Sequence, residues 1–179
     1  MGVARSVLSA RPVRRSAYLS TFITLGNARQ PFDRLLRGVA AVDHLLPAPV
    51  FVQSGATHCA HPGWTIRDFV EMSEFERLVQ QSALVIMQGG AGSIINAVRL
   101  GRLPVVMPRR AKYREIVDDH QLEFVEALGS TGRVAVALEP EDLSAAIGRA
   151  LSRDAHAAAQ NPAPLVDRIA QLLRTLEKR

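Results

Sequence analysis

The run from Gln88 to Ser93 is the strongest chemical signal in the sequence, because three of its six residues are glycine. It follows the apolar segment 84–87, and residues 94–100 continue with helical periodicity. Glycines let a ligand approach the backbone closely, and a helix start offers free amide groups, so this unit is typical of phosphate or diphosphate binding. The alternative is a tight turn that needs glycine only for its backbone, since the run lacks the G-x-G-x-x-G spacing of nicotinamide enzymes and the lysine of a P-loop.

A second group of polar residues follows the apolar segment 104–107, where a parallel strand would open into the ligand-binding crevice of an α/β sheet. Its members carry guanidinium, carboxylate and amide groups: Arg109, Arg110, Asp118, Asp119 and Gln121. The arginines could contact an anionic group, and the other three could bind sugar hydroxyls. The alternative is a solvated charged loop in which an aspartate caps the next helix.

A third candidate follows the first apolar segment, where Gly26 and Asn27 form a turn and Phe32 and Asp33 precede a helix. The turn could line the same crevice. The alternative for Asp33 is an acidic residue that favours the dipole at a helix start.

Three potential metal ligands, His58, Cys59 and His61, lie within four residues. A closed zinc site needs four ligands, and no second pair stands at a suitable spacing, so we interpret the three as a chance cluster and expect no metal. The sequence also lacks G-x-S-x-G and H-E-x-x-H motifs, which excludes the common serine hydrolases and zinc proteases.

The elements that must position these residues alternate between strand-length apolar segments and segments of helical periodicity, which is typical of a parallel sheet. The expected strands are residues 21–25, 50–53, 65–70, 84–87, 104–107 and 134–138; the expected helices are 32–46, 73–81, 94–100, 118–129, 141–151 and 165–178. A capping box formed by Ser73 and Glu76 predicts the start of the second helix. We therefore expect an α/β fold, a Rossmann-like parallel sheet with helices on both faces.

Length and composition fit one globular domain, since the 179 residues are 47% hydrophobic and 22% charged. The net charge of +5 is concentrated in residues 1–19, which hold four arginines and no acidic residue. Because the basicity belongs to this extension, we expect no nucleic-acid partner. We divide the chain into a basic extension expected to be disordered (1–19), an α/β domain (20–152), and a linker with a final helix (153–179).

The cysteine content and the length of the apolar runs argue against a disulfide and against a membrane-spanning helix. Cys59 is the only cysteine, so an internal disulfide is excluded and a reducing compartment is the default. No run approaches the roughly 18 apolar residues that a membrane-spanning helix requires.

Several of these segments fall into a recognisable order: TLGN and PFDRL (24–27 and 31–35), VFVQSG (50–55), QGGAGSIINAVRLGRLPVVMPR (88–109) and EIVDDHQ (115–121). Together they resemble the C-terminal, nucleotide-sugar-binding half of family 28 glycosyltransferases. More narrowly, they are similar to small stand-alone bacterial proteins of exopolysaccharide and capsule synthesis that pair with a membrane-bound partner. The resemblance covers residues 21–151 and implies a single GT-B half.

The resemblance also implies which residues bind a UDP-sugar donor without a metal. The diphosphate would lie on Gly89, Gly90, Gly92 and Ser93, and the ribose near Asn96. The donor sugar would lie near Asp118, Asp119, His120 and Gln121. The remaining members of the expected crevice are Gly26, Asn27, Gln88 and Arg109.

Three positions depart from the family pattern. Gln88 stands where histidine usually precedes the glycine turn, Asn27 replaces the threonine of a Gly-Thr pair, and residues 115–117 read Glu-Ile-Val where Glu-His-Val is frequent. Because glutamine cannot accept and return a proton, we expect the catalytic base in the partner or at His120.

We therefore expect a UDP-sugar-binding subunit of an inverting glycosyltransferase that transfers a sugar to a lipid-linked acceptor in polysaccharide biosynthesis. It would be cytoplasmic and peripheral at the inner face of the membrane, through a membrane-anchored partner that holds the acceptor. The alternative is a non-catalytic activator or interaction subunit, which Gln88 and Asn27 favour.

Overall fold

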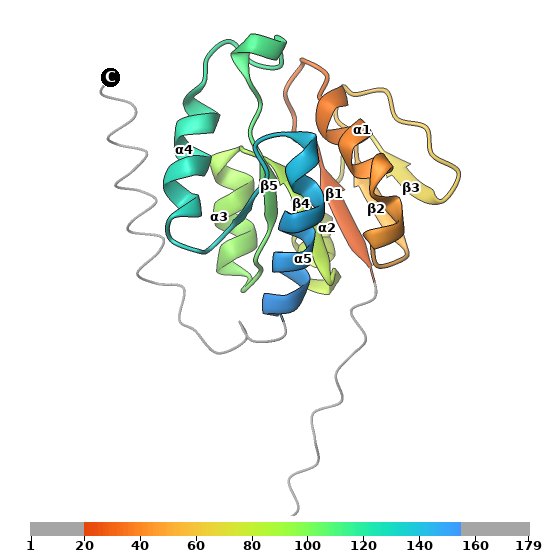
Figure 1. Ribbon diagram of the computed structural model, residues 1–179. Coiled ribbons are helices and arrows are strands. Elements are labelled where there is room, and N and C mark those ends of the chain that lie inside the picture. Colours follow the sequence, from red (N-terminus) through yellow and green to blue (C-terminus); the bar gives the residue numbers. More distant parts are fainter. Residues whose placement is uncertain (1–19, 155–179) are drawn as a thin grey trace, which may run out of the picture.

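Six parallel strands form the centre of the molecule in the computed structural model, which describes residues 20–154 (Figure 1). The strands are β1 (Thr21–Thr24), β2 (Val50–Gln53), β3 (Trp64–Arg67), β4 (Leu84–Gln88), β5 (Val105–Met107) and β6 (Ala135–Val136). Their order across the sheet is β3-β2-β1-β4-β5-β6, and all neighbours are parallel. The predicted basic extension and the predicted helix at 165–178 lie outside the described residues.

Helices cover both faces of the sheet. One face carries α1 (Asp33–Ala41) and α5 (Leu143–Asp154), and the other carries α2 (Met72–Gln81), α3 (Ala91–Arg99) and α4 (His120–Gly129). Short 3-10 helices are η1 (Asp43–Leu45), η2 (Ala111–Tyr113) and η3 (Pro140–Asp142).

The central strand β4 shows why the apolar segments become buried strands. Leu84 and Ile86 pack into the core shared with α1 and α5, whereas Val85 and Met87 pack into the core shared with α2, α3 and α4. Side chains alternate between the two faces of a strand, so a strand covered on both faces must be apolar throughout.

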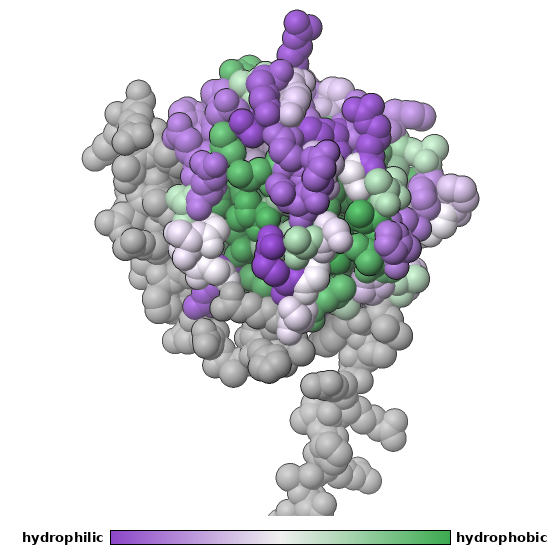
Figure 2. Space-filling model, in the orientation of Figure 1, coloured by the Kyte–Doolittle hydropathy of each residue, from purple (hydrophilic) through white to green (hydrophobic). Residues whose placement is uncertain are grey.

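The strand order confirms the predicted α/β fold and gives it the Rossmann topology, in which the connections reverse direction between β1 and β4. A crevice forms at such a switch point, outside the carboxyl ends of the strands. Figure 2 shows hydrophilic residues gathered over this carboxyl edge, at the top of the view.

Each of the five helices predicted within residues 20–154 differs from the observed helix by one to five residues at one or both ends, and α3 begins at Ala91 rather than at residue 94. Two of the differences have a clear cause. The helix expected over 32–46 ends at Ala41 and resumes as η1, where Asp43 accepts a hydrogen bond from the Trp64 indole (2.7 Å). The capping box of Ser73 and Glu76 does not form, because α2 already begins at Met72 and no side chain caps it.

The strands expected at 65–70 and 134–138 are also shorter than predicted, as β3 and β6 show. Within residues 20–154, no helix is long and apolar enough to cross a membrane.

Candidate functional site

A pocket of about 380 Å³ opens at the switch point, between the carboxyl ends of β1, β2 and β4 and the start of α3. Seven of the residues predicted to bind a ligand line it: Gly26, Asn27, Gln88, Gly90, Gly92, Ser93 and Asn96. The sheet therefore brings together predicted residues from two separate sequence segments, 26–27 and 88–96.

The start of α3 supplies amide groups to this pocket. Gly90 is its N-cap and no side chain caps the helix, so the amides of the first turn stay available to a ligand. A Cβ atom added at Gly92 would meet nothing within 4 Å. The glycine thus leaves open space beside the positive end of a helix dipole, which is the geometry of an anion site.

The side chain of Gln88 fills the space between two glycines. A Cβ at Gly90 would lie 2.7 Å from Gln88 Nε2, and a Cβ at Gly26 would overlap the same atom. Gly26 also has a φ of +75°, which favours glycine on backbone grounds. Gly89 does not line the pocket, because its missing side chain faces Gln121 and Val125 of α4.

Two side chains at the pocket have an acceptor oxygen that receives no hydrogen bond from any residue of 20–154. Gln53, 4% exposed, donates from Nε2 to Asn27 Oδ1 (3.0 Å), while its Oε1 is buried without a partner. Asn96 donates to Glu76 Oε1 (3.0 Å), and its Oδ1 is likewise unpaired. Buried polar atoms are nearly always paired, so these two oxygens are exceptions in the wall of the pocket.

Arg109 does not reach the pocket, which corrects the prediction that it contacts an anionic group. Its side chain is buried, with the guanidinium over the ring of Phe32 (4.6 Å) and hydrogen-bonded to the carbonyl oxygens of Leu25 (2.8 Å), Gln30 (2.8 Å) and Glu115 (3.2 Å). Burial lowers the pKa of Arg109, and the charge of Glu115 opposes this shift. Its donors are therefore used to join the segments that follow β1 and β5.

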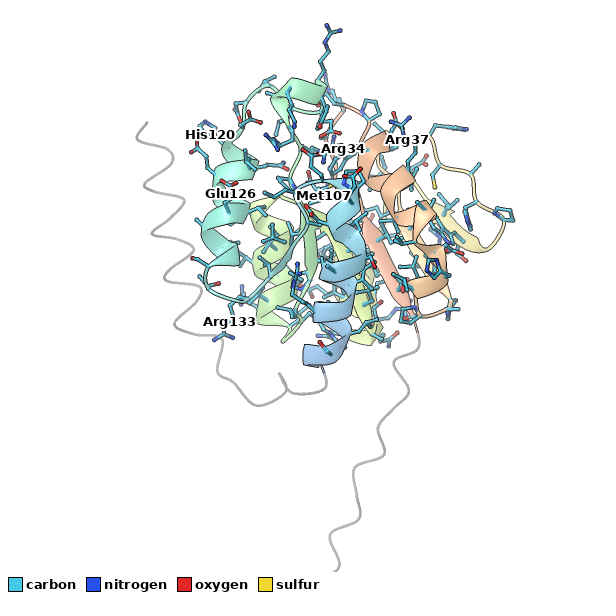
Figure 3. The ribbon with its side chains drawn as sticks, viewed as in Figure 1. Arg34, Arg37, Met107, His120, Glu126 and Arg133 are labelled. Atoms are coloured by element: carbon cyan, nitrogen blue, oxygen red, sulfur yellow. The ribbon has the colours of Figure 1, made fainter. Side chains whose placement is uncertain are left out.

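The predicted donor-sugar residues lie on the loop before α4 and in the first turn of α4, rather than in the pocket lining. Asp118 accepts a hydrogen bond from the His120 amide (3.1 Å), and Asp119 accepts one from Ala111 (3.0 Å). The exposed His120 side chain stands at the outer start of α4, away from Arg34 (Figure 3). Gln121 alone connects to the pocket, by donating to Gln88 Oε1 (3.2 Å).

Sequence reasoning misses five lining residues: Thr24, Gln53, Val70, Met72 and Phe75. Gln53 carries a usable signal, since it is a polar residue at the carboxyl end of a buried strand. The three apolar residues carry none, because the same types fill the core.

A buried ion cluster beside the site is also absent from the predictions. Arg34 forms two hydrogen bonds with the Glu115 carboxylate (3.0 and 2.9 Å) and reaches Glu139 (3.3 Å). The three residues lie far apart in the chain, so only the fold brings them together.

Glu139 gives this cluster a predicted pH dependence. Burial is the largest influence on the pKa of Glu139 and raises it, but Lys112, Arg34 and Tyr113 together outweigh burial and hold the pKa below its ordinary value. The stabilisation that Glu139 contributes is therefore present above the unfolded pKa of about 4.3 and is lost as the pH falls through the lower folded pKa.

We expect Glu139→Gln to lower the free energy of unfolding by roughly 0.5–1 kcal/mol at pH 7. Urea unfolding from pH 7 to 3 checks this, since the difference from wild type should shrink below about pH 4; a difference that persists would contradict the assignment.

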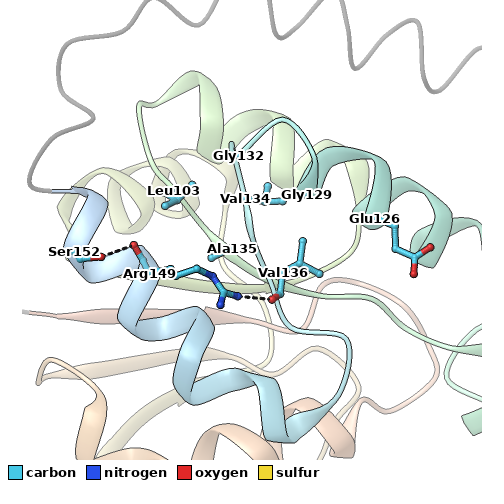
Figure 4. A pocket seen from close by; sticks show the side chains of 9 residues that line it. All are labelled: Leu103, Glu126, Gly129, Gly132, Val134, Ala135, Val136, Arg149 and Ser152. Carbon is cyan, nitrogen blue, oxygen red and sulfur yellow. Dashed lines mark hydrogen bonds between the residues drawn. The ribbon is translucent and has the colours of Figure 1, made fainter.

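A larger cavity, of about 970 Å³, lies at the sheet edge between β6, α4 and α5 (Figure 4). Arg149 closes one side through a hydrogen bond to the Val136 carbonyl oxygen (2.9 Å). This larger cavity lies beside the edge strand β6 rather than at the switch point, and none of the predicted binding residues lines it. The switch-point pocket is therefore the candidate site.

The parallel sheet in this order, with an uncapped helix start and a pocket at the strand reversal, defines an open α/β domain of the Rossmann class. Residues 51–175 match the glycosyltransferase family 28 C-terminal domain, and the chain belongs to this family.

A curated relative is the UDP-N-acetylglucosamine transferase subunit ALG13 of Cryptococcus neoformans var. neoformans serotype D, in strains JEC21 and B-3501A. The identity is 41% over 71 residues, which cover 40% of this chain and 34% of the relative. The match thus spans about a third of the relative's length.

Solved structures with the same fold include the glycosyltransferase of kitacinnamycin (TM-score 0.57, 19% identity, 96% of this chain and 44% of that chain). MurG of Acinetobacter baumannii is also similar (TM-score 0.51, 20% identity, 87% of this chain and 50% of that chain). These likenesses confirm the predicted fold, a Rossmann-like half of the GT-B type.

Proposed function

We propose that the chain binds a UDP-sugar in the switch-point pocket, as the donor-binding subunit of an inverting glycosyltransferase. The observation that carries the proposal is the uncapped start of α3, where Gly92 leaves open space at the positive end of the helix dipole. Family membership supports the reaction class, and the name of the fungal relative suggests UDP-N-acetylglucosamine as a donor to test first.

The pocket offers a different surface to each part of such a donor. The amides at Gly90–Ser93 would bind the diphosphate without a metal, and the ribose would lie near Asn96, which lines the pocket. Val70, Met72 and Phe75 form an apolar side suited to the uracil ring. Because 380 Å³ lies near the lower end of the usual ligand-pocket range, the sugar would extend from the mouth toward residues 118–121.

The acceptor and the base would come from a partner. None of the residues that line the pocket carries an ionisable side chain, so nothing there can deprotonate an acceptor hydroxyl. Four large hydrophobic side chains of residues 20–154 are exposed: Phe69 and Met72 lie between β3 and the first turn of α2, and Tyr113 and Val117 lie between β5 and α4. Met72 also lines the pocket, so the exposed apolar pair of Phe69 and Met72 beside the site favours a protein interface there.

We extend the proposal to a membrane-anchored partner that holds a lipid-linked sugar acceptor at the inner face of the membrane, in polysaccharide biosynthesis. The fungal relative is named as a transferase subunit, which supports the presence of another subunit. The exposed Phe69 and Met72 beside the pocket give that subunit a surface to bind.

Calorimetry tests donor binding directly. UDP and UDP-N-acetylglucosamine should bind the isolated chain, ADP should bind at least tenfold more weakly, and excess EDTA should not change the affinity. Absence of binding heat for every uridine nucleotide, with the partner also present, would overturn the proposal.

A non-catalytic subunit is the second candidate, favoured by the uncharged Gln88 at the position expected for histidine. A turnover assay on the reconstituted pair separates the two, with Gly92→Asp as the blocked variant. Loss of transfer supports a donor-binding subunit, whereas full transfer after the substitution supports an activator.

A further inference from the structure

The buried Arg109 makes a specific contact with the pocket wall, although it does not reach the pocket itself. It donates from Nε to Gln88 Oε1 (3.0 Å), and Gln121 Nε2 donates to the same oxygen (3.2 Å). An arginine offers only donors, so the atom that faces it must be the oxygen of the Gln88 amide. Arg109 therefore determines which end of the amide points toward the pocket.

The other end of the Gln88 amide lies on the pocket side. The space that Gly26 and Gly90 leave free is occupied by Gln88 Nε2, and no residue of 20–154 accepts a hydrogen bond from this atom. Two N–H groups are thus presented between the turn after β1 and the start of α3. These groups can be satisfied only by an acceptor oxygen from solvent or a ligand.

We infer that Arg109 and Gln121 are positioning residues, which hold Gln88 so that its Nε2 donates a hydrogen bond to a phosphate or sugar oxygen of the bound nucleotide. This inference rests on the proposed function. It replaces a direct role of Arg109 in anion binding with an indirect one. It also makes the contribution of Gln88 uncharged and independent of pH, since an amide does not titrate between pH 5 and 9.

Double-mutant cycles with UDP affinity as the readout test this inference. Gln88→Ala should weaken UDP binding about tenfold, and Arg109→Lys should weaken it by a similar factor, because a lysine ammonium cannot reproduce the guanidinium contacts. In the Gln88→Ala background, Arg109→Lys should change the affinity less than twofold. Full additivity would overturn the positioning role.

A second pair of variants covers the case in which Arg109→Lys does not fold. Gln121→Met removes one donor to Gln88 Oε1 at nearly constant volume, and it should weaken binding severalfold only while Gln88 is present. Gln88→Glu should bind UDP at least tenfold more weakly at every pH from 5 to 8, because the carboxylate offers no N–H group and adds a negative charge, and the neighbouring Arg109 keeps it ionised over this range. A wild-type-like, pH-independent affinity for Gln88→Glu would contradict donation by Nε2.

A measurement without ligand separates this inference from the proposed function. Gly90→Ala should lower the unfolding midpoint in wild type, because the new Cβ meets Gln88 Nε2, and should have little effect in Gln88→Ala. Equal effects in both backgrounds would show that Gln88 is not held between the glycines. Absence of UDP binding combined with a positive stability cycle would overturn the proposed function and the donation to nucleotide, but would support the placement of Gln88 between the two glycines.

Discussion

Gly92→Asp is expected to abolish UDP binding while the folded state keeps or gains stability. Gly92 is the second residue of α3, and its Cβ position meets nothing within 4 Å, so a side chain fits without displacing protein atoms. An acidic residue in the first turn favours the helix dipole, and glycine is a poor helix former. A carboxylate there would stand where the diphosphate must lie, which should weaken binding by on the order of a hundredfold or more.

Matched variants separate charge, size and helix propensity in this prediction. Gly92→Asn has nearly the same volume without the charge and should lose less affinity than Gly92→Asp. Gly148→Ala introduces a side chain into similarly open space on the exposed face of α5 and should leave UDP affinity unchanged. Calorimetry and thermal unfolding measure both effects. Wild-type affinity in Gly92→Asp would contradict a diphosphate site at α3, and an unfolded variant would contradict the open geometry.

Arg34→Met is expected to destabilise the fold by about 3–5 kcal/mol, the usual cost of leaving a buried charge without its partner. The Glu115 side chain is 7% exposed, and its carboxylate would keep only the hydrogen bond from the Arg110 amide (3.0 Å). Arg34 also donates to the carbonyl oxygens of Pro108 (2.7 Å) and Leu138 (2.9 Å), so the substitution removes contacts to three chain segments. Urea unfolding gives the free energy directly.

The double variant Arg34→Met with Glu115→Met should recover only part of this loss, because it removes the unpaired carboxylate but also the negative charge that opposes the burial of Arg109. Arg77→Met is the matched control on an exposed pair: Arg77 bonds Glu74 (2.6 Å) with a half-exposed side chain, and its loss should cost about 0.5 kcal/mol or less. A cost below about 1 kcal/mol for Arg34→Met would show that the buried cluster is not a stabilising element.

Both experiments address the same edge of the sheet in different ways. The pocket is uncharged and uses amide groups, whereas the ion cluster of Arg34, Glu115 and Glu139 holds the adjoining loops. Changes at Arg34 should therefore alter stability first, and changes at Gly92 should alter binding without a loss of stability.

The sequence by itself determines the alternation of strands and helices and the position of the glycine run. Both are local properties: the buried run at 84–88 must be a strand covered on two faces, and glycines at its carboxyl end fall at the ligand-binding edge of any parallel sheet. This is why seven predicted residues from separate segments meet in one pocket. Helix ends were less predictable from the sequence. For example, α1 ends at Ala41, and the following η1 is held by a hydrogen bond between Asp43 and Trp64, a residue of β3 that lies far along the chain.

The tertiary structure alone decides where each polar side chain points. Arg109 and Arg110 are adjacent arginines after the same strand, yet the first turns inward to Leu25 and Gln88 while the second pairs with Asp119 and Glu139. Their residue types are identical, so nothing local distinguishes them. The direction is set by carbonyl oxygens that need donors in the interior, and these oxygens belong to segments up to 84 residues away in the chain.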